Sequence, residues 1–170
     1  MLNKNTMKIT TPTDREILVS RSFNAPLQAV WDAMSKTELL RQWLFGPPGW
    51  KMTICDEDTR VGGKFHWGWS GPDGKEMSMR GEYRELTPPS GAATEARIVR
   101  TERFDFGCPE QAAEQLCTLI LKEADRQTHL TLSIVYPSKE ARDGALASGM
   151  EHGMASGYDR LDNIFATRSV

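Results

Sequence analysis

The sequence predicts an α+β fold in which a curved antiparallel β-sheet of about seven strands surrounds a long C-terminal helix. Three features predict it: a strand-like segment followed by helical periodicity near the N terminus, a succession of strand-like segments through the middle, and an amphipathic stretch at the end. The 170 residues, 39% of them hydrophobic, are enough for one well-filled core. We therefore expect a flexible N-terminal segment over 1–13 and a single domain over 14–168.

The first strand is expected at 15–23, where β-branched and apolar residues run up to a stop at NAP. Apolar residues then recur at helical spacing over 26–44, and SKTE (35–38) offers a fresh N-cap at Ser35 or Thr37 within that stretch. Two short helices are the simplest interpretation. GPPG (46–49) ends the second one, because neither proline can extend a helix.

Six strands are predicted next, and they should form an antiparallel meander. Their segments are 50–63, 64–74, 75–91, 96–107, 114–127 and 128–136. The turn is clearest at Pro-Asp-Gly (72–74), which lies between two alternating segments and indicates a hairpin.

Alternation predicts which sheet face is buried. Phe65, Trp67 and Trp69 share one face, and Met77, Met79 and Tyr83 share the same face of the next strand. The segment 96–107 is ambiguous. One face holds Ile98, Arg100, Glu102, Phe104 and Phe106, the other holds Val99, Thr101 and Arg103, and a salt-bridged outer face is favoured for Arg100, Glu102 and Arg103.

The segment 149–166 predicts a helix with an apolar stripe of Met150, Met154, Leu161, Ile164 and Phe165. Along its edge lie Gly149, Gly153 and Gly157, and a glycine inside a helix costs about 1 kcal/mol relative to alanine. Two compatible explanations can account for glycines at these positions despite that cost. The helix backbone packs closely against the sheet around Trp67 and Trp69, or the missing side chains leave room for a ligand.

Composition excludes several classes of function. The net charge of -2 supplies no basic field, so neither nucleic acid nor a membrane surface is an expected partner. No apolar run resembles a secretory signal or a membrane span, and the expected location is the cytoplasm. The cysteines, Cys55, Cys108 and Cys117, lack the paired spacing of zinc or redox sites and are expected to be reduced structural thiols.

The sequence singles out no catalytic residue, and we expect neither a metal nor another cofactor. His66, His129 and His152 are expected at the surface, and CDEDTR (55–60) is best explained as a charged turn. There is no phosphate-binding loop and no nucleophile elbow. The hydroxyls of Tyr83 and Tyr158 remain as possible polar anchors inside a cavity.

Three segments, 29–50, 61–86 and 149–166, resemble the helix-grip proteins of the START-like (SRPBCC) superfamily. Within it they are most similar to the domain named after the C-terminal half of the activator of heat-shock protein 90 ATPase, and the similarity extends from Asp14 to Ala166. The resemblance implies a cavity between the sheet and the last helix. Members of the superfamily bind lipids, sterols, polyketides or plant hormones, and some catalyse cyclisation.

The resemblance and the residue patterns together predict a set of cavity-lining residues: Trp43, Trp50, Phe65, Trp67, Trp69, Met79, Tyr83, Phe104, Met150, Gly153, Met154, Gly157 and Tyr158. Trp43 and Trp50 flank the GPPG loop, which would form part of the cavity mouth.

Three functions are compatible with these residues. The first is binding of a small hydrophobic or aromatic molecule, such as a lipid or a polyketide-like compound. The second is a cyclase- or dehydratase-type enzyme that uses the same cavity, which requires a buried Glu or Arg facing it. The third is a chaperone-interacting module, which requires an exposed apolar patch on the outer sheet face. The sequence leaves open the ligand and the choice between a monomer and a homodimer.

Overall fold

The computed structural model describes residues 7–105 and 113–168. Within them the strands form one antiparallel sheet in the order β1-β2-β8-β7-β6-β5-β4-β3. The strands are β1 (Lys8–Thr10), β2 (Glu16–Phe23), β3 (Lys51–Glu57), β4 (Lys64–Ser70), β5 (Glu76–Thr87), β6 (Glu95–Asp105), β7 (Glu114–Ala124) and β8 (Gln127–Val135). The helices are α1 (Leu27–Ser35), α2 (Thr37–Trp43), α3 (Lys139–Ala147) and α4 (Met150–Arg168), and a 3₁₀ turn, η1, covers Pro72–Gly74.

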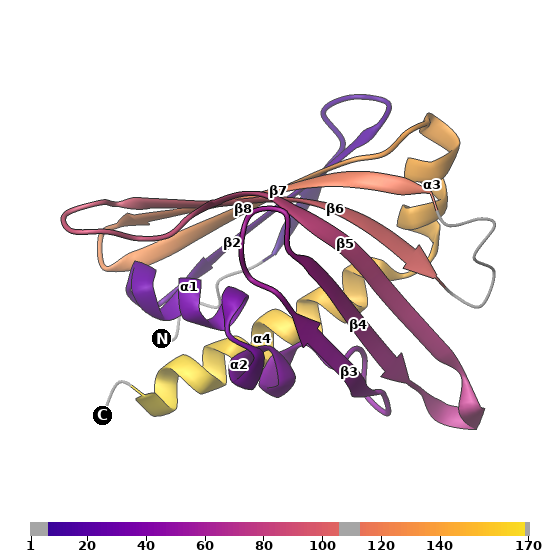
Figure 1. Cartoon of the computed structure of the whole chain (residues 1–170), viewed down its shortest axis with the longest axis horizontal. Helices are drawn as coiled ribbons and strands as arrows, with labels where there is room; N and C mark the ends of the chain where they lie inside the picture. Colours follow the sequence, from indigo (N-terminus) through magenta and orange to yellow (C-terminus); the bar gives the residue numbers. More distant parts are fainter. Residues whose placement is uncertain (1–6, 106–112, 169–170) are drawn as a thin grey trace.

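The sheet arches over α4, and α2 lies against α4 (Figure 1). The six-strand meander runs without interruption from β3 to β8, and β2 pairs with β8 at its far side. The predicted α+β class and the helix-grip arrangement are therefore confirmed.

The sheet has eight strands, where the sequence predicts about seven. The additional strand, β1, lies inside the segment 1–13 that was expected to be flexible, and its Lys8 pairs with Ser20 of β2. Three residues are too few to show an alternating pattern, so this strand depends on the edge that β2 offers rather than on a signal of its own.

Strand β2 supplies one wall of the core. Its side chains alternate along the strand, so that Ile17, Val19 and Phe23 are buried together with Arg21. The Arg21 guanidinium donates to Asp162 at 2.5 Å and to Asp159 at 3.3 Å, both on α4. This contact pairs the buried charge and holds the C-terminal half of α4 against the sheet.

The two short helices meet at Lys36, whose extended backbone (φ -97, ψ 127) ends α1 and begins α2. The expected side-chain cap is absent, because neither helix has a side-chain hydrogen bond at its N-cap. Ser35 instead donates its hydroxyl to the carbonyl of Trp31 at 2.7 Å. The break therefore comes from the backbone, and capping by Ser35 or Thr37 was a wrong prediction.

The C-terminal region holds two helices rather than one. Ser138 caps α3 by accepting a hydrogen bond from the Ala141 amide at 3.1 Å. Gly149 then turns the chain with a φ of +81, which favours glycine, and α4 begins at Met150. Gly149 therefore separates the helices, and only Gly153 and Gly157 of the predicted row lie inside a helix. No described helix is long and apolar enough to cross a membrane.

Candidate functional site

The inner face of the sheet is aromatic, as predicted. Phe65, Trp67 and Trp69 of β4 are 2%, 3% and 5% exposed. Their rings form a continuous row, with centroid separations of 4.5 Å between Phe65 and Trp67 and 6.5 Å between Trp67 and Trp69. Phe104 of β6 extends the row by stacking on Trp69 at 6.0 Å. This face is turned toward α4 and forms one side of the candidate site.

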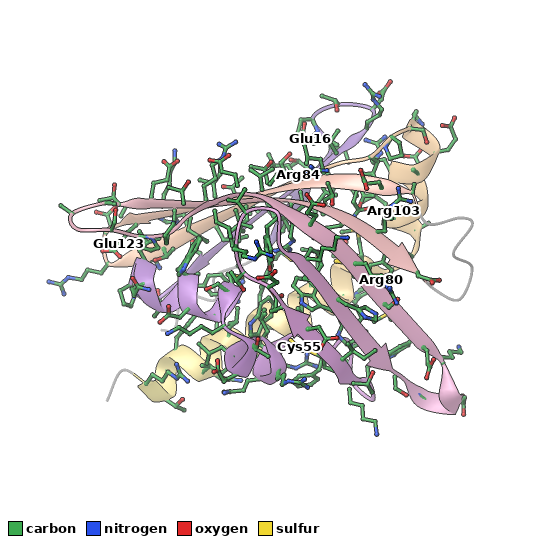
Figure 2. All side chains as sticks on the ribbon, viewed as in Figure 1. Glu16, Cys55, Arg80, Arg84, Arg103 and Glu123 are labelled. Carbon is green, nitrogen blue, oxygen red and sulfur yellow. The ribbon has the colours of Figure 1, made fainter. Side chains whose placement is uncertain are left out.

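Strand β6 places a charged pair on this same face. Ala96, Ile98 and Glu102 are buried, and the side chains of Arg100 and Glu102 are only 12% and 4% exposed. The prediction of an outer salt bridge is therefore wrong for these two residues, whereas Arg103 is exposed. Figure 2 shows Arg103 and Arg84 on the side of the sheet away from α4.

The buried pair is held by contacts on every side. Arg100 Nε donates to Glu102 Oε2 at 2.8 Å, and Glu102 Oε1 accepts from Gln115 Nε2 at 3.0 Å. The guanidinium carbon lies 5.0 Å from the Trp67 ring centroid, within the range of a cation–π contact. Burial alone lowers the pKa of Arg100, but the adjacent Glu102 carboxylate outweighs it, so the pKa of Arg100 is raised overall and the group stays charged.

Glu57, at the end of β3, forms a second polar group inside the sheet. It accepts hydrogen bonds from Trp67 Nε1 at 2.7 Å and from the Tyr83 hydroxyl at 2.6 Å. Burial raises the pKa of Glu57, and the hydrogen bonds from Tyr83 and Trp67 partly oppose this. The same segment places Cys55 inside the core, and burial raises the pKa of its thiol to about 11.

The sequence does not single out Glu57, because CDEDTR (55–60) is best explained there as a charged turn. The signal that could have found it is alternation, since Cys55 and Glu57 are two residues apart and share one face of β3.

Helix α4 and the loop after α2 form the opposite side of the site. A Cβ at Gly157 would lie 3.2 Å from Trp43 Cε3, and one at Gly153 would lie 3.7 Å from Pro47. The close approach at Gly157 is therefore to α2 and its loop, and the expected approach to Trp67 and Trp69 is a wrong prediction. Further contacts fix this loop: Trp69 Nε1 donates to the Leu44 carbonyl at 2.7 Å.

Arg160 joins the loop to α4. Its guanidinium carbon lies 3.5 Å from the Phe45 ring centroid, and its NH1 donates to the Trp43 carbonyl at 3.2 Å. Burial lowers the pKa of Arg160. The loop is thus packed against the helix at the end of the sheet where β3 and β4 lie.

Tyr158 points from α4 into the core. It is 5% exposed, its ring stacks on Trp43 at 6.0 Å, and it meets Phe23 edge-on at 5.6 Å. Burial raises the pKa of Tyr158, so its hydroxyl keeps its proton. Within the described residues this hydroxyl has no hydrogen-bond partner.

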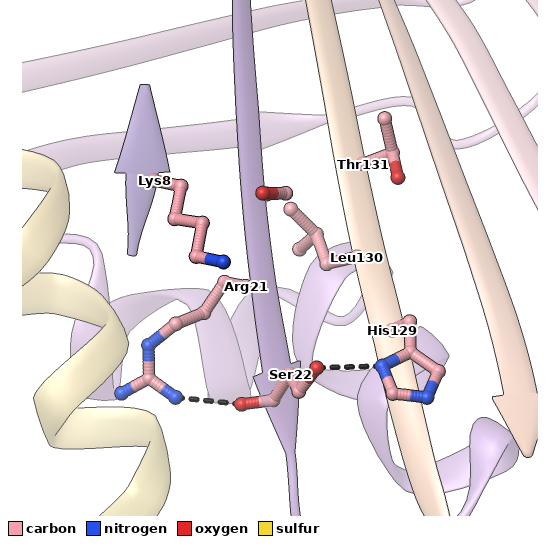
Figure 3. Close-up of a pocket in the computed structure, with 7 residues that line it drawn as sticks. Lys8, Arg21, Ser22, His129, Leu130 and Thr131 are labelled. Atoms are coloured by element: carbon pink, nitrogen blue, oxygen red, sulfur yellow. Dashed lines mark hydrogen bonds between the residues drawn. The ribbon is translucent and has the colours of Figure 1, made fainter. Parts of the chain in front are cut away.

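The histidines lie away from this interior. His129 and His152 are exposed, and His66 is half-buried with its pKa lowered by burial. His129 Nδ1 lies 2.6 Å from the Ser22 hydroxyl in a shallow pocket of about 270 Å³ beside β1 (Figure 3). The other lining residues include Lys8 and Arg21. Among the described residues no cluster of acidic, cysteine or histidine side chains could hold a metal ion.

Comparison with models of protein families shows to which family this chain belongs. The profile of the family described as activator of Hsp90 ATPase homolog 1-like protein matches residues 24–166. The chain belongs to this family.

Solved structures of similar chains share the fold of this family member. A protein from Rhodobacter sphaeroides is 30% identical with a TM-score of 0.81, and the match covers 95% of this chain and 99% of that one. A Nitrosomonas europaea protein is 20% identical with a TM-score of 0.76, covering 94% and 99%. A Chromobacterium violaceum protein is 22% identical with a TM-score of 0.74, covering 90% and 98%. The last two show the fold alone. No curated protein matches this chain.

In this family member, the side chains predicted to line a cavity all belong to the core or pack against it. Trp43, Phe65, Trp67, Trp69, Tyr83 and Tyr158 are buried, whereas Trp50, Met79, Phe104, Met150 and Met154 are half-buried. The half-buried set comes from α4, from the loop after α2, and from β5 and β6. Their role as a ligand-binding wall stays a prediction.

Proposed function

We propose that this protein binds a small, largely apolar molecule between the inner face of the sheet and α4. One observation carries the proposal: the Arg100–Glu102 pair lies within a largely apolar face rich in aromatic side chains. Replacing such a pair by apolar residues is often neutral or stabilising, so the pair is better explained by a specific task than by stability. Ligand pockets combine apolar walls with a few convergent polar groups, and this interior has that composition.

The position of Arg100 supports the proposal. Strand β6 pairs with β5 and β7 on its two sides, so Arg100 is remote from either sheet edge. Its side chain nevertheless keeps 12% of its surface exposed. That surface is on the inner face, which is turned toward α4, where a bound molecule would reach it.

The half-buried methionines also support it. Met79 faces the interior from β5, and Met150 and Met154 face it from the first turns of α4. Methionine has an unbranched, polarisable side chain that adapts to the shape of a ligand. Tyr136, which is buried, donates its hydroxyl to Met150 Sδ at 3.9 Å, a weak contact that a ligand could replace.

Two measurements test the proposal. Native mass spectrometry of freshly purified protein should detect a non-covalent mass that disappears on denaturation. The fluorescent probe N-phenyl-1-naphthylamine, which is apolar and neutral, should become brighter on binding. Gly153→Leu should weaken this probe about tenfold or more, because the new side chain extends from α4 toward Pro47 at the proposed site.

Gly144→Leu is the matched control. Gly144 lies in α3, and a Cβ there would meet nothing within 4 Å. The control should bind the probe as the wild type does. The proposal fails if the wild-type protein does not brighten the probe, or if both variants bind it equally well.

An enzyme of the cyclase or dehydratase type is the second candidate. It is favoured by buried Glu102 and by half-buried Glu57 and Arg100, since such an activity requires a Glu or Arg facing the interior. Glu57 and Tyr83 are hydrogen-bonded and could exchange a proton with a bound molecule. If Glu57→Gln retains a bound molecule heavier by one water than the wild type does, the enzyme is supported. Identical retained masses argue for binding alone.

The chaperone-interacting module is third. The outer face of β4 and β5 carries Lys64, Arg80, Glu82 and Arg84, which is a polar surface. The exposed apolar side chains Leu116 and Val135 are cross-strand neighbours on β7 and β8, and they form a small pair rather than a broad patch.

A further inference from the structure

We infer that Tyr158 and Arg100 form a pair of hydrogen-bond donors for a neutral carbonyl-type acceptor on the bound molecule. The inference rests on the proposed function and names the chemical class of its ligand: a largely apolar ketone, ester or amide. Two unused donors, one on α4 and one on β6, carry the argument.

The Tyr158 hydroxyl is the first donor. The residue is 5% exposed, yet its hydroxyl has no hydrogen-bond partner within the described residues. The one fully enclosed side-chain polar atom that lacks a hydrogen-bond partner within the described residues is Arg97 Nε. The Tyr158 hydroxyl therefore keeps some accessible surface. An acceptor on the ligand would give this hydroxyl the hydrogen bond that it lacks.

The Arg100 guanidinium is the second donor. Its hydrogen bond to Glu102 uses Nε alone, and a guanidinium carries five N–H donors in a fixed fork. The Cys117 thiol lies close enough to accept one of them. At least one terminal amino group therefore remains for another acceptor, on a side chain that is 12% exposed.

The two donors face one interior region. Burial is the main cause of the raised pKa of Tyr158, and electrostatic interactions with the Cys117, Arg100 and Glu102 side chains also affect it. Those three residues lie on β6 and β7, opposite α4 in the sheet that arches over it (Figure 1). A single acceptor between α4 and the central strands could thus be reached from both sides.

The charge of the interior selects a neutral acceptor over an anion. Glu57 and Glu102 both face this region, and Arg100 is already paired with Glu102. Arg21, a buried cation on β2, is bound by Asp159 and Asp162. A carboxylate ligand would add a negative charge beside two existing ones, whereas a carbonyl oxygen accepts the same hydrogen bonds without that cost.

Two probes of similar size separate this inference from the proposed function. N-phenyl-1-naphthylamine has no carbonyl group, and the naphthyl ketone prodan has one. Tyr158→Phe should weaken prodan binding about tenfold and change the affinity for N-phenyl-1-naphthylamine less than about twofold. The substitution keeps the ring stacked on Trp43, so the variant should fold.

Thr128→Val is the matched control, because it also removes a buried hydroxyl, but one that already donates to the Ala25 carbonyl at 2.8 Å and lies outside the proposed lining. It should leave prodan binding unchanged. The double variant Arg100→Gln, Glu102→Gln removes the guanidinium without leaving an unpaired charge, and it should weaken prodan selectively as Tyr158→Phe does.

The outcomes are distinct. If N-phenyl-1-naphthylamine fails to bind the wild type, the proposed function is wrong and the inference with it. If that probe binds and Tyr158→Phe leaves prodan binding unchanged, the donor pair is wrong and the proposed function stands. If the naphthoic acid corresponding to prodan binds more tightly than the ketone, the acceptor is an anion and the neutral class is overturned.

Discussion

Arg100 and Glu102 lie on the inner face of a central strand, and their side chains are only 12% and 4% exposed, so both charges are largely removed from water. Glu102→Gln leaves the Arg100 charge buried without a counter-charge, and we expect it to lower the free energy of unfolding by about 3–5 kcal/mol. The double variant Arg100→Met, Glu102→Leu removes both charges and should be close to the wild type. Urea unfolding of the three proteins measures both effects. Equal losses in the single and double variants would contradict the account.

Glu57 gives a prediction for pH. Because burial raises its pKa in the folded chain, the unfolded chain ionises first as pH rises. The folded state therefore loses stability from the ordinary carboxyl range up to the higher folded pKa, and the loss is complete above it. Glu57→Gln lacks this titration. The unfolding free energy of the variant minus that of the wild type should increase between pH 4 and neutrality, as measured by urea unfolding at several pH values. A difference that stays constant or decreases with pH would contradict a raised pKa of Glu57 in the folded chain.

At the scale of residues, the sequence predicted the aromatic positions of the site and misplaced the charged ones. Phe65, Trp67 and Trp69 alternate with polar or small residues, so their face could be predicted. In β6 both faces mix apolar and charged residues, and only the tertiary contacts with Gln115 and Trp67 decide that Arg100 and Glu102 turn inward. Such contacts join different strands, and the residue pattern within one strand does not predict them.

Helix α4 contains two interior glycines in different surroundings. A Cβ at Gly153 would make ordinary contact with Pro47 at 3.7 Å, whereas one at Gly157 would press on the Trp43 ring at 3.2 Å. Gly153→Ala should therefore stabilise the protein by about 1 kcal/mol through helix propensity. Gly157→Ala should destabilise it by about 1 kcal/mol, because overpacking exceeds the same gain. Thermal unfolding of the two variants compares them directly. Stabilisation by Gly157→Ala would show that Trp43 moves away at little cost.

At the scale of elements, the strands of the meander, the two short helices and the last helix could be predicted from periodicity and turn residues. The exceptions have local causes. Strand β1 is only three residues long. Helix α3 is largely polar, and its only buried side chain is Arg142. Arg142 reaches back to the Thr13 carbonyl at 2.8 Å, a contact between distant parts of the chain that no periodicity reveals.

For the whole molecule, the two sheet edges differ in what covers them. β1 ends one edge as a short strand, and β3 ends the other, where its pairing with β4 shifts register between Met52 and Ile54. The β3 edge is also next to the loop after α2, which packs on α4 through Arg160. If a molecule enters the interior, we expect this edge and loop to separate, because opening there breaks the pairing of β3 with β4 alone.

Cys55 and Cys117 report on that separation. Cys55 lies on β3 at the sheet edge and Cys117 on β7 between two strands, and both thiols are buried with raised pKa values. Alkylation requires the thiolate, so each should react only when its strand opens. We expect iodoacetamide to modify Cys55 at least about tenfold faster than Cys117 in native protein, measured by peptide mass after timed quenching and normalised to rates in urea. Equal native rates would mean that the sheet opens only as a unit. In that case the β3 edge would not be the part of the molecule that separates to admit a ligand.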